Sequence, residues 1–146
     1  MTSKQRELEF ASRDGDIVDI YIDGAARGNP GQSGIGVLIK QGSDSHEIKK
    51  YLGERTNNQA EYTALITALE AADTLRDLTI NIYTDSLLVA NQVNGVWKVK
   101  HPDIAKLNKT ARELMGKYKN ARITHIPREQ NREADRLANL AIDEYL

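Results

Sequence analysis

The chain has 146 residues, of which 40% are apolar and 28% are charged, and its formal net charge is −1. These values are typical of one soluble globular domain, and they lack the excess of basic residues that marks many nucleic-acid-binding proteins. The chain contains no cysteine, which excludes disulfides, thiolate zinc sites and a cysteine nucleophile.

The N-terminal segment has no apolar stretch of the signal-peptide type. Residues 1–15 are polar and aperiodic, and we expect them to form a mobile tail before the folded domain. No apolar run reaches the length of a membrane-spanning helix. We therefore expect a cytoplasmic monomer with no membrane association and no protein partner.

Three strands are expected first. Residues 17–23 form a β-rich run, which leads into a loop rich in Gly, Asn and Pro at residues 24–31. Residues 34–39 form a second run, and a polar turn at residues 41–45 precedes a third at about residues 47–52. These short connections predict an antiparallel meander.

Helices and strands alternate in the rest of the chain. Thr56 or Asn57 can cap a helix in which apolar residues recur at helical spacing as far as Ala72. The remaining elements are expected to be a strand at 78–83, helices at 86–94 and 103–118, a strand at 121–126 and a helix from 131 onward. This order predicts an α/β fold with a mixed five-stranded sheet flanked by helices.

Four carboxylates stand at comparable places in these elements. Asp23 and Asp85 end predicted strands, and Glu61 and Asp135 lie in the first turns of predicted helices. Each one alone is more often a cap, turn or solvated residue. Together they lie where an α/β sheet forms ligand sites. One like-charge pair at about 4 Å costs roughly 4 kcal/mol at an effective dielectric near 20, so such a cluster predicts a bound divalent cation such as Mg²⁺ and metal-assisted phosphoryl chemistry.

Four motifs surround these carboxylates in chain order. They read YIDGAARGNPG at residues 21–31, TNNQAE at 56–61, YTDS at 83–86 and HIPREQNREAD at 125–135. With these motifs the chain resembles a type 1 ribonuclease H from about residue 17 to its C-terminus. A lone Thr-Asp-Ser would be weak, but the four motifs in this order are very specific.

The resemblance implies an endonuclease that hydrolyses the RNA strand of RNA/DNA hybrids and leaves 5′-phosphate and 3′-hydroxyl ends. It implies a ribonuclease-H-like sheet, with three antiparallel strands followed by two parallel ones, in a catalytic domain at residues 16–146. It also implies two Mg²⁺ or Mn²⁺ ions per site, and it assigns their binding and catalysis to Asp23, Glu61, Asp85 and Asp135.

Substrate contacts are implied by the same resemblance. The positions that would read RNA 2′-hydroxyls are Gly24, Asn29, Asn57, Asn58 and Gln59, and Thr56 matches a residue that holds a DNA phosphate. Asn29 also belongs to a turn and Thr56 to a helix cap, and neither local role excludes the contact.

The chain departs from the family at residues 94–102. Many members carry a long basic protrusion there, whereas this segment is short, which suggests weaker binding of the hybrid. Trp97 and Lys98 could meet the DNA strand by stacking and phosphate contact. Partial packing of Trp97 into the core is an equal alternative.

A second departure lies in the loop before Asp135. Many members have a glycine-rich loop with a histidine that helps release of product or metal. Here His125 has the matching spacing but is followed by Ile126 and Pro127, which are stiffer. Two hypotheses remain open: His125 is the auxiliary catalytic residue, or its ring is packed within a strand and Arg128 reaches the scissile phosphate instead.

Two other functions fit the same fold class. An inactive nucleic-acid-binding domain would be expected to lack one of the four carboxylates, and none is missing here. A different nuclease or a transposase of this fold would rarely retain the motifs at residues 21–31 and 56–61, which serve recognition of 2′-hydroxyls.

Overall fold

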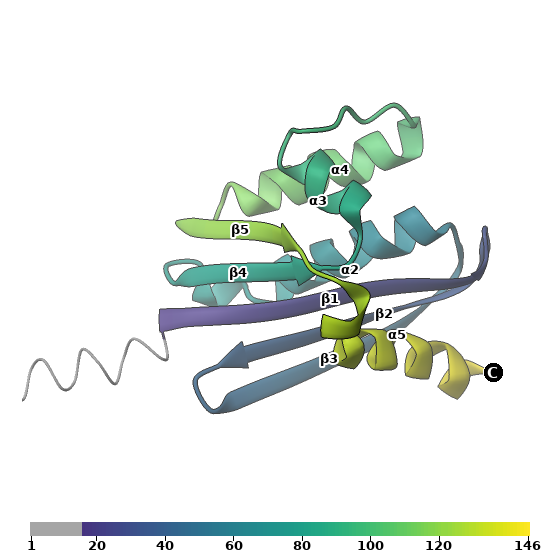
Figure 1. The fold of residues 1–146 in the computed structure, drawn as a ribbon, viewed down its shortest axis with the longest axis horizontal. Coiled ribbons are helices and arrows are strands. Elements are labelled where there is room, and N and C mark those ends of the chain that lie inside the picture. The colour runs from purple at the N-terminus through teal and green to yellow at the C-terminus, as the bar shows by residue number, and fades with distance from the viewer. Residues whose placement is uncertain (1–15) are drawn as a thin grey trace, which may run out of the picture.

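The computed structural model describes residues 16–146, which form a five-stranded sheet in the order β3-β2-β1-β4-β5 (Figure 1). The first three strands are antiparallel, and β4 and β5 are parallel to β1. This confirms the predicted mixed sheet. The predicted tail at residues 1–15 lies outside the described residues. The strands are β1 (Ile17–Gly28), β2 (Gly31–Gln41), β3 (Asp44–Arg55), β4 (Thr79–Thr84) and β5 (Asn120–His125).

Helices cover both faces of the sheet. One face packs against α2, whereas α5 lies across the other face on β2, β3 and β1 (Figure 1). Within residues 16–146, no helix has the length and apolar composition needed to cross a membrane. The helical elements are α2 (Asn57–Ala71), α3 (Leu87–Val93), α4 (Pro102–Met115), α5 (Arg132–Tyr145) and the 3-10 turns η1 (Asp73–Leu75) and η2 (Arg128–Gln130).

The core lies between the central strands and α2. Alternate residues of β1 and β4, including Ile20, Ile22 and Ile82, are fully buried and pack in one cluster with Leu65 and Leu69 of α2. The residues that alternate with them are only partly buried, as far as Tyr21 in β1 and Tyr83 in β4. This alternation is typical of a sheet with one fully covered face.

The predicted end of the first strand at residue 23 is wrong. β1 continues to Gly28 and pairs with β2 as far as Gly28 opposite Gly31, so only Asn29 and Pro30 form the turn. The prediction relied on Gly, Asn and Pro as turn residues. The ladder of β1 and β2 pairs backbone groups, and glycine and alanine can join it whenever a partner strand continues alongside.

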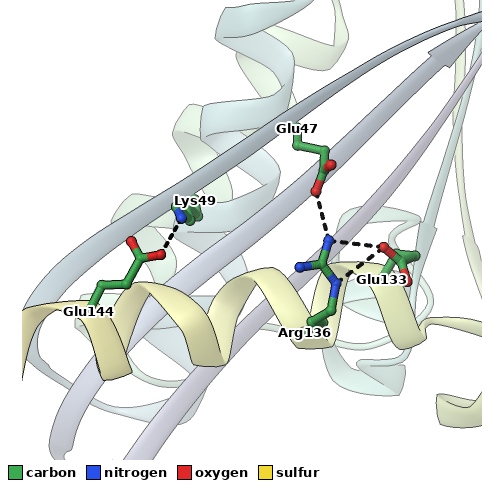
Figure 2. Close-up of polar contacts among 5 residues, drawn as sticks. All are labelled: Glu47, Lys49, Glu133, Arg136 and Glu144. Carbon is green, nitrogen blue, oxygen red and sulfur yellow. Dashed lines mark hydrogen bonds and ion pairs between the residues drawn. The ribbon is translucent and has the colours of Figure 1, made fainter.

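Gly36 of β2 allows α5 to lie directly on the sheet. A Cβ atom at this position would be 2.1 Å from the carbonyl oxygen of Ala134 in α5, where no atom can fit. Exposed ion pairs join the same helix to β3: Arg136 contacts Glu47 at 2.9 Å, and Lys49 pairs with Glu144 (Figure 2). Such exposed pairs add little stability, so close packing is the main determinant of the helix position.

We predict that Gly36→Ala destabilises the protein by about 2 kcal/mol or more, because overpacking must push α5 away from β2. Urea denaturation measures this change. Gly116→Ala is the matched control: its Cβ would meet the nearest atom at an ordinary 3.4 Å and its φ is −65°. Equal stability of the two variants would show that α5 does not need the glycine.

Candidate active site

Strand register brings the first two carboxylates together. The parallel pairing of β1 and β4 ends with Ile22 opposite Thr84, and the residue that follows each of them in the chain is an aspartate, Asp23 and Asp85. Asp23 is therefore within β1 rather than at its end, but it lies level with the end of β4. Ser86 then caps α3 by accepting a hydrogen bond from the Val89 amide, so the chain turns away from this edge.

The third carboxylate is delivered by α2. Thr56 and Gln59 form a reciprocal capping box: the Thr56 hydroxyl accepts from the Gln59 amide at 3.1 Å, and the Gln59 side chain accepts from the Thr56 amide at 2.9 Å. The capping box fixes where α2 begins and therefore where Glu61 lies along the helix. Glu61 is only 4% exposed. A carboxylate oxygen of Glu61 accepts a hydrogen bond of 2.6 Å from the Gly24 amide.

Gly24 is required by the close approach of β1 and α2. A Cβ atom there would be 2.3 Å from the carbonyl carbon of Ala60. The glycine after Asp23 therefore allows Glu61 to reach the strand. The Gly24 amide is already used by Glu61, and Oε1 of Gln59 by the cap, so two of the predicted substrate residues also hold the site together.

All four predicted carboxylates line one cleft. Oxygen atoms of Asp23, Glu61 and Asp85 lie within 4.8 Å of one another, and Asp135, in the first turn of α5, borders the same cleft of about 380 Å³. The buried Asn131 also belongs to this arrangement, although its sequence position predicted only the start of a helix. Its side-chain amide donates to the Ile22 carbonyl at 2.8 Å and ties the start of α5 to β1 beside Asp23.

The cluster is strongly acidic and poorly solvated. Burial, followed by the charges of Glu61 and Asp85, raises the pKa of Asp23 to about 10. Burial also raises the pKa of Glu61 to about 7, against the opposing hydrogen bond from Gly24. The donor atoms are all carboxylate oxygens, which are the ligands that hard divalent cations prefer. The residues present therefore fit a divalent metal ion.

The structure places Arg128 at the cleft. Arg128 lies in η2, borders the cleft and holds a terminal nitrogen 3.8 Å from Oδ1 of Asp135. His125 is the last residue of β5 and is exposed, so the expectation that its ring packs within the strand is wrong. It is not among the residues that border the cleft in the described part of the chain.

The predicted substrate residues continue from the cleft along one surface. Asn57 borders the cleft, and its backbone amide donates to Oδ1 of Asn29 at 3.1 Å. Asn58 borders two adjoining grooves. The groove of about 300 Å³ is also bordered by Asn29, Thr56 and Gln59, and the groove of about 580 Å³ by Trp97, Lys98 and Lys100. The Trp97 side chain is 45% exposed at this groove, which leaves part of its ring accessible.

The fold and the acidic cleft define a class of metal-dependent enzymes that act on phosphate esters. A family described as reverse transcriptase-like matches residues 21–141. The chain is similar to ribonuclease HI of Halobacterium salinarum, with 43% identity over 132 residues, 89% of this chain and 66% of that protein. It is also similar to ribonuclease H of Chlorobaculum parvum, with 34% identity over 146 residues, 87% of this chain and 96% of that protein.

The chain is also similar in structure to a solved ribonuclease H. The structure of LC11-RNase H1 in complex with an RNA/DNA hybrid superimposes with a TM-score of 0.81 and 44% identity, covering 88% of this chain and 98% of that chain. The chain belongs to the type 1 ribonuclease H family. It spans 66% of the Halobacterium protein and 35% of a longer bifunctional protein of Mycobacterium tuberculosis.

The raised pKa values predict how the stability of the metal-free protein depends on pH. From about pH 4 upward the folded protein keeps protons that the unfolded chain releases, on Glu61 until about pH 7 and on Asp23 until about pH 10, so this site loses stability as the pH rises through that range. We expect Asp23→Asn to be more stable than the parent in EDTA, by a margin that grows from pH 5 to pH 9. Urea denaturation at several pH values measures the margin, and a margin independent of pH would contradict the assignment.

Proposed function

We propose that this protein is an endonuclease that hydrolyses the RNA strand of RNA/DNA hybrids and leaves 5′-phosphate and 3′-hydroxyl ends. The observation that carries the proposal is the cluster of Asp23, Glu61, Asp85 and Asp135 at one cleft beside amide-lined grooves. Membership of the ribonuclease H family supports it, as does the likeness to LC11-RNase H1, whose structure contains a hybrid. We further propose that residues 16–146 are the catalytic domain of a cytoplasmic monomer.

The four carboxylates would hold two Mg²⁺ or Mn²⁺ ions. When bound, such ions activate a water molecule and neutralise charge on the scissile phosphate. The protein contributes four ligands from four separate elements, so their spacing is set before any ion arrives. Arg128 adds a positive group at the rim, where it can approach a phosphate oxygen.

The choice of strand would come from the groove residues. The phosphodiester is the same in RNA and DNA, so carboxylates and metal ions cannot distinguish the two strands. The amide side chains of Asn29, Asn57 and Asn58 lie along the surface that leaves the cleft and can pair with 2′-hydroxyls. Trp97 and Lys98 border the groove beyond Asn58, where they would meet the DNA strand.

Single deoxy substitutions in the RNA strand test this function. We predict Mg²⁺-dependent cleavage of the hybrid on the RNA strand alone, with cleavage lost where a deoxynucleotide replaces a ribonucleotide facing the Asn57 and Asn58 surface. Gel analysis of labelled strands measures each product, and DNA duplex serves as the control. Equal cutting of every substituted strand, or cutting of DNA duplex, would indicate a different nuclease of the same fold.

We predict that Asp85→Asn abolishes cleavage but raises the melting temperature in EDTA. Loss of a ligand removes metal binding, whereas loss of one negative charge relieves repulsion with Asp23 and Glu61, by about 1 kcal/mol after screening. Differential scanning calorimetry and a cleavage assay measure the two effects. Unchanged cleavage would remove Asp85 from the site, and a lowered melting temperature would assign its carboxylate a structural role.

The positions of Arg128 and His125 predict that removing their side chains has unequal effects on the cleavage rate. We expect Arg128→Ala to lower the single-turnover rate by roughly 10²-fold, as loss of a group that stabilises transition-state charge does. His125→Ala should change the rate little, because that side chain lies outside the cleft. A large loss for His125→Ala with little loss for Arg128→Ala would assign the role to the histidine.

A further inference from the structure

Asp135 is held by a chain of polar contacts with residues that are not among the four predicted metal ligands. Asn139, one turn further along α5, donates from Nδ2 to the backbone oxygen of Asp135 at 3.0 Å and to its carboxylate Oδ1 at 3.4 Å. On its other side, Oδ1 of Asn139 accepts from Arg27 at 3.3 Å. Arg27 in turn contacts Asp143 at 2.7 Å.

These contacts fix the orientation of the Asn139 amide. Nδ2 must face Asp135, because the reversed amide would place an oxygen against a carboxylate. Oδ1 then faces Arg27, which has donors only and suits an acceptor. The half-buried Asn139 is therefore held at both ends, and it offers Asp135 a donor in one fixed direction.

Asp143 is the acidic partner of Arg27 in this structure. Arg27 ends near the acidic cleft, and a free guanidinium there would be drawn to the carboxylates and compete with a metal ion. The ion pair with Asp143, on the exposed side of α5, holds the guanidinium against Asn139 instead. Arg27 and Asn139 are 112 positions apart in the chain, so this connection joins the end of β1 to α5.

We propose that Asn139 is a positioning residue for Asp135, and that Arg27 and Asp143 keep it in place, so that the three together set the affinity of the cleft for divalent metal. This rests on the proposed metal-dependent function of the site. Residues that orient metal-binding carboxylates commonly change metal affinity by 10- to 100-fold when they are removed.

Titration of Mn²⁺ into the protein without nucleic acid tests the proposal. We expect Asn139→Ala to weaken Mn²⁺ binding about 10-fold, and to raise the Mg²⁺ concentration for half-maximal cleavage by a similar factor. The KM for the hybrid should stay unchanged at saturating Mg²⁺. Asp143→Asn, an exposed change outside the cleft, should shift Mn²⁺ affinity in the same direction by a smaller factor.

Arg136→Ala is the matched control. Arg136 adjoins Asp135 in the chain, but its guanidinium pairs with Glu47 and Glu133 (Figure 2), and Arg136 is not among the described residues that border the cleft. This variant removes exposed ion pairs of the same helix at little cost in stability, and it should leave Mn²⁺ affinity unchanged. Equal losses for Asn139→Ala and Arg136→Ala would mean that only the seating of α5 matters, and would overturn the proposal.

Two further outcomes separate the proposal from its alternatives. If Arg27→Ala raises the KM for the hybrid and leaves Mn²⁺ affinity unchanged, Arg27 is a substrate contact and the proposal fails. If the parent protein binds Mn²⁺ in an Asn139-dependent way but does not cut hybrid, the inference stands and the proposed function fails.

Discussion

Mutual repulsion among buried carboxylates is the constraint on which the rest of the site depends. Asp23 and Glu61 are almost fully buried within 4.8 Å of Asp85, and water cannot offset their charges there. Without a cation, burial and neighbouring charge raise the pKa of Asp23 and of Glu61. The cluster therefore keeps protons, which reduces the repulsion. A divalent ion would replace those protons. The fold thus maintains an unfavourable arrangement that metal binding relieves.

The elements around the cluster are built to maintain it. Gly24 lets α2 approach β1 closely enough for Glu61 to reach the strand, and Gly36 lets α5 lie on β2 so that Asp135 reaches the same cleft. In both places a backbone group of the sheet and a helix meet with no room for a side chain between them. These contacts lie within regular strands and helices, so packing sets the four carboxylates in place without a metal ion.

The sequence predicted the parts of this account that depend on local pattern. Residue type and spacing were enough for the order of strands and helices and for the choice of the four carboxylates that line the cleft, although Asp23 lies within β1 rather than at its end. The extent of β1 could not be predicted, because Gly24 to Gly28 look like a turn until β2 is seen to continue alongside. The contact of Arg27 with Asn139 joins residues 112 positions apart and has no local signal. The choice between His125 and Arg128 depends on where side chains project at the end of β5, which spacing does not determine.

The most direct test of the central claim is the number of protons released when Mn²⁺ binds. Calorimetric titration at pH 7 in buffers of different ionisation enthalpy measures that number without nucleic acid or catalysis. We predict release of about one proton or more per protein, since protonated carboxylates must ionise to become ligands. Asp23→Asn should release fewer. Tight binding with no proton released would mean that the cluster is already ionised, and would contradict the account.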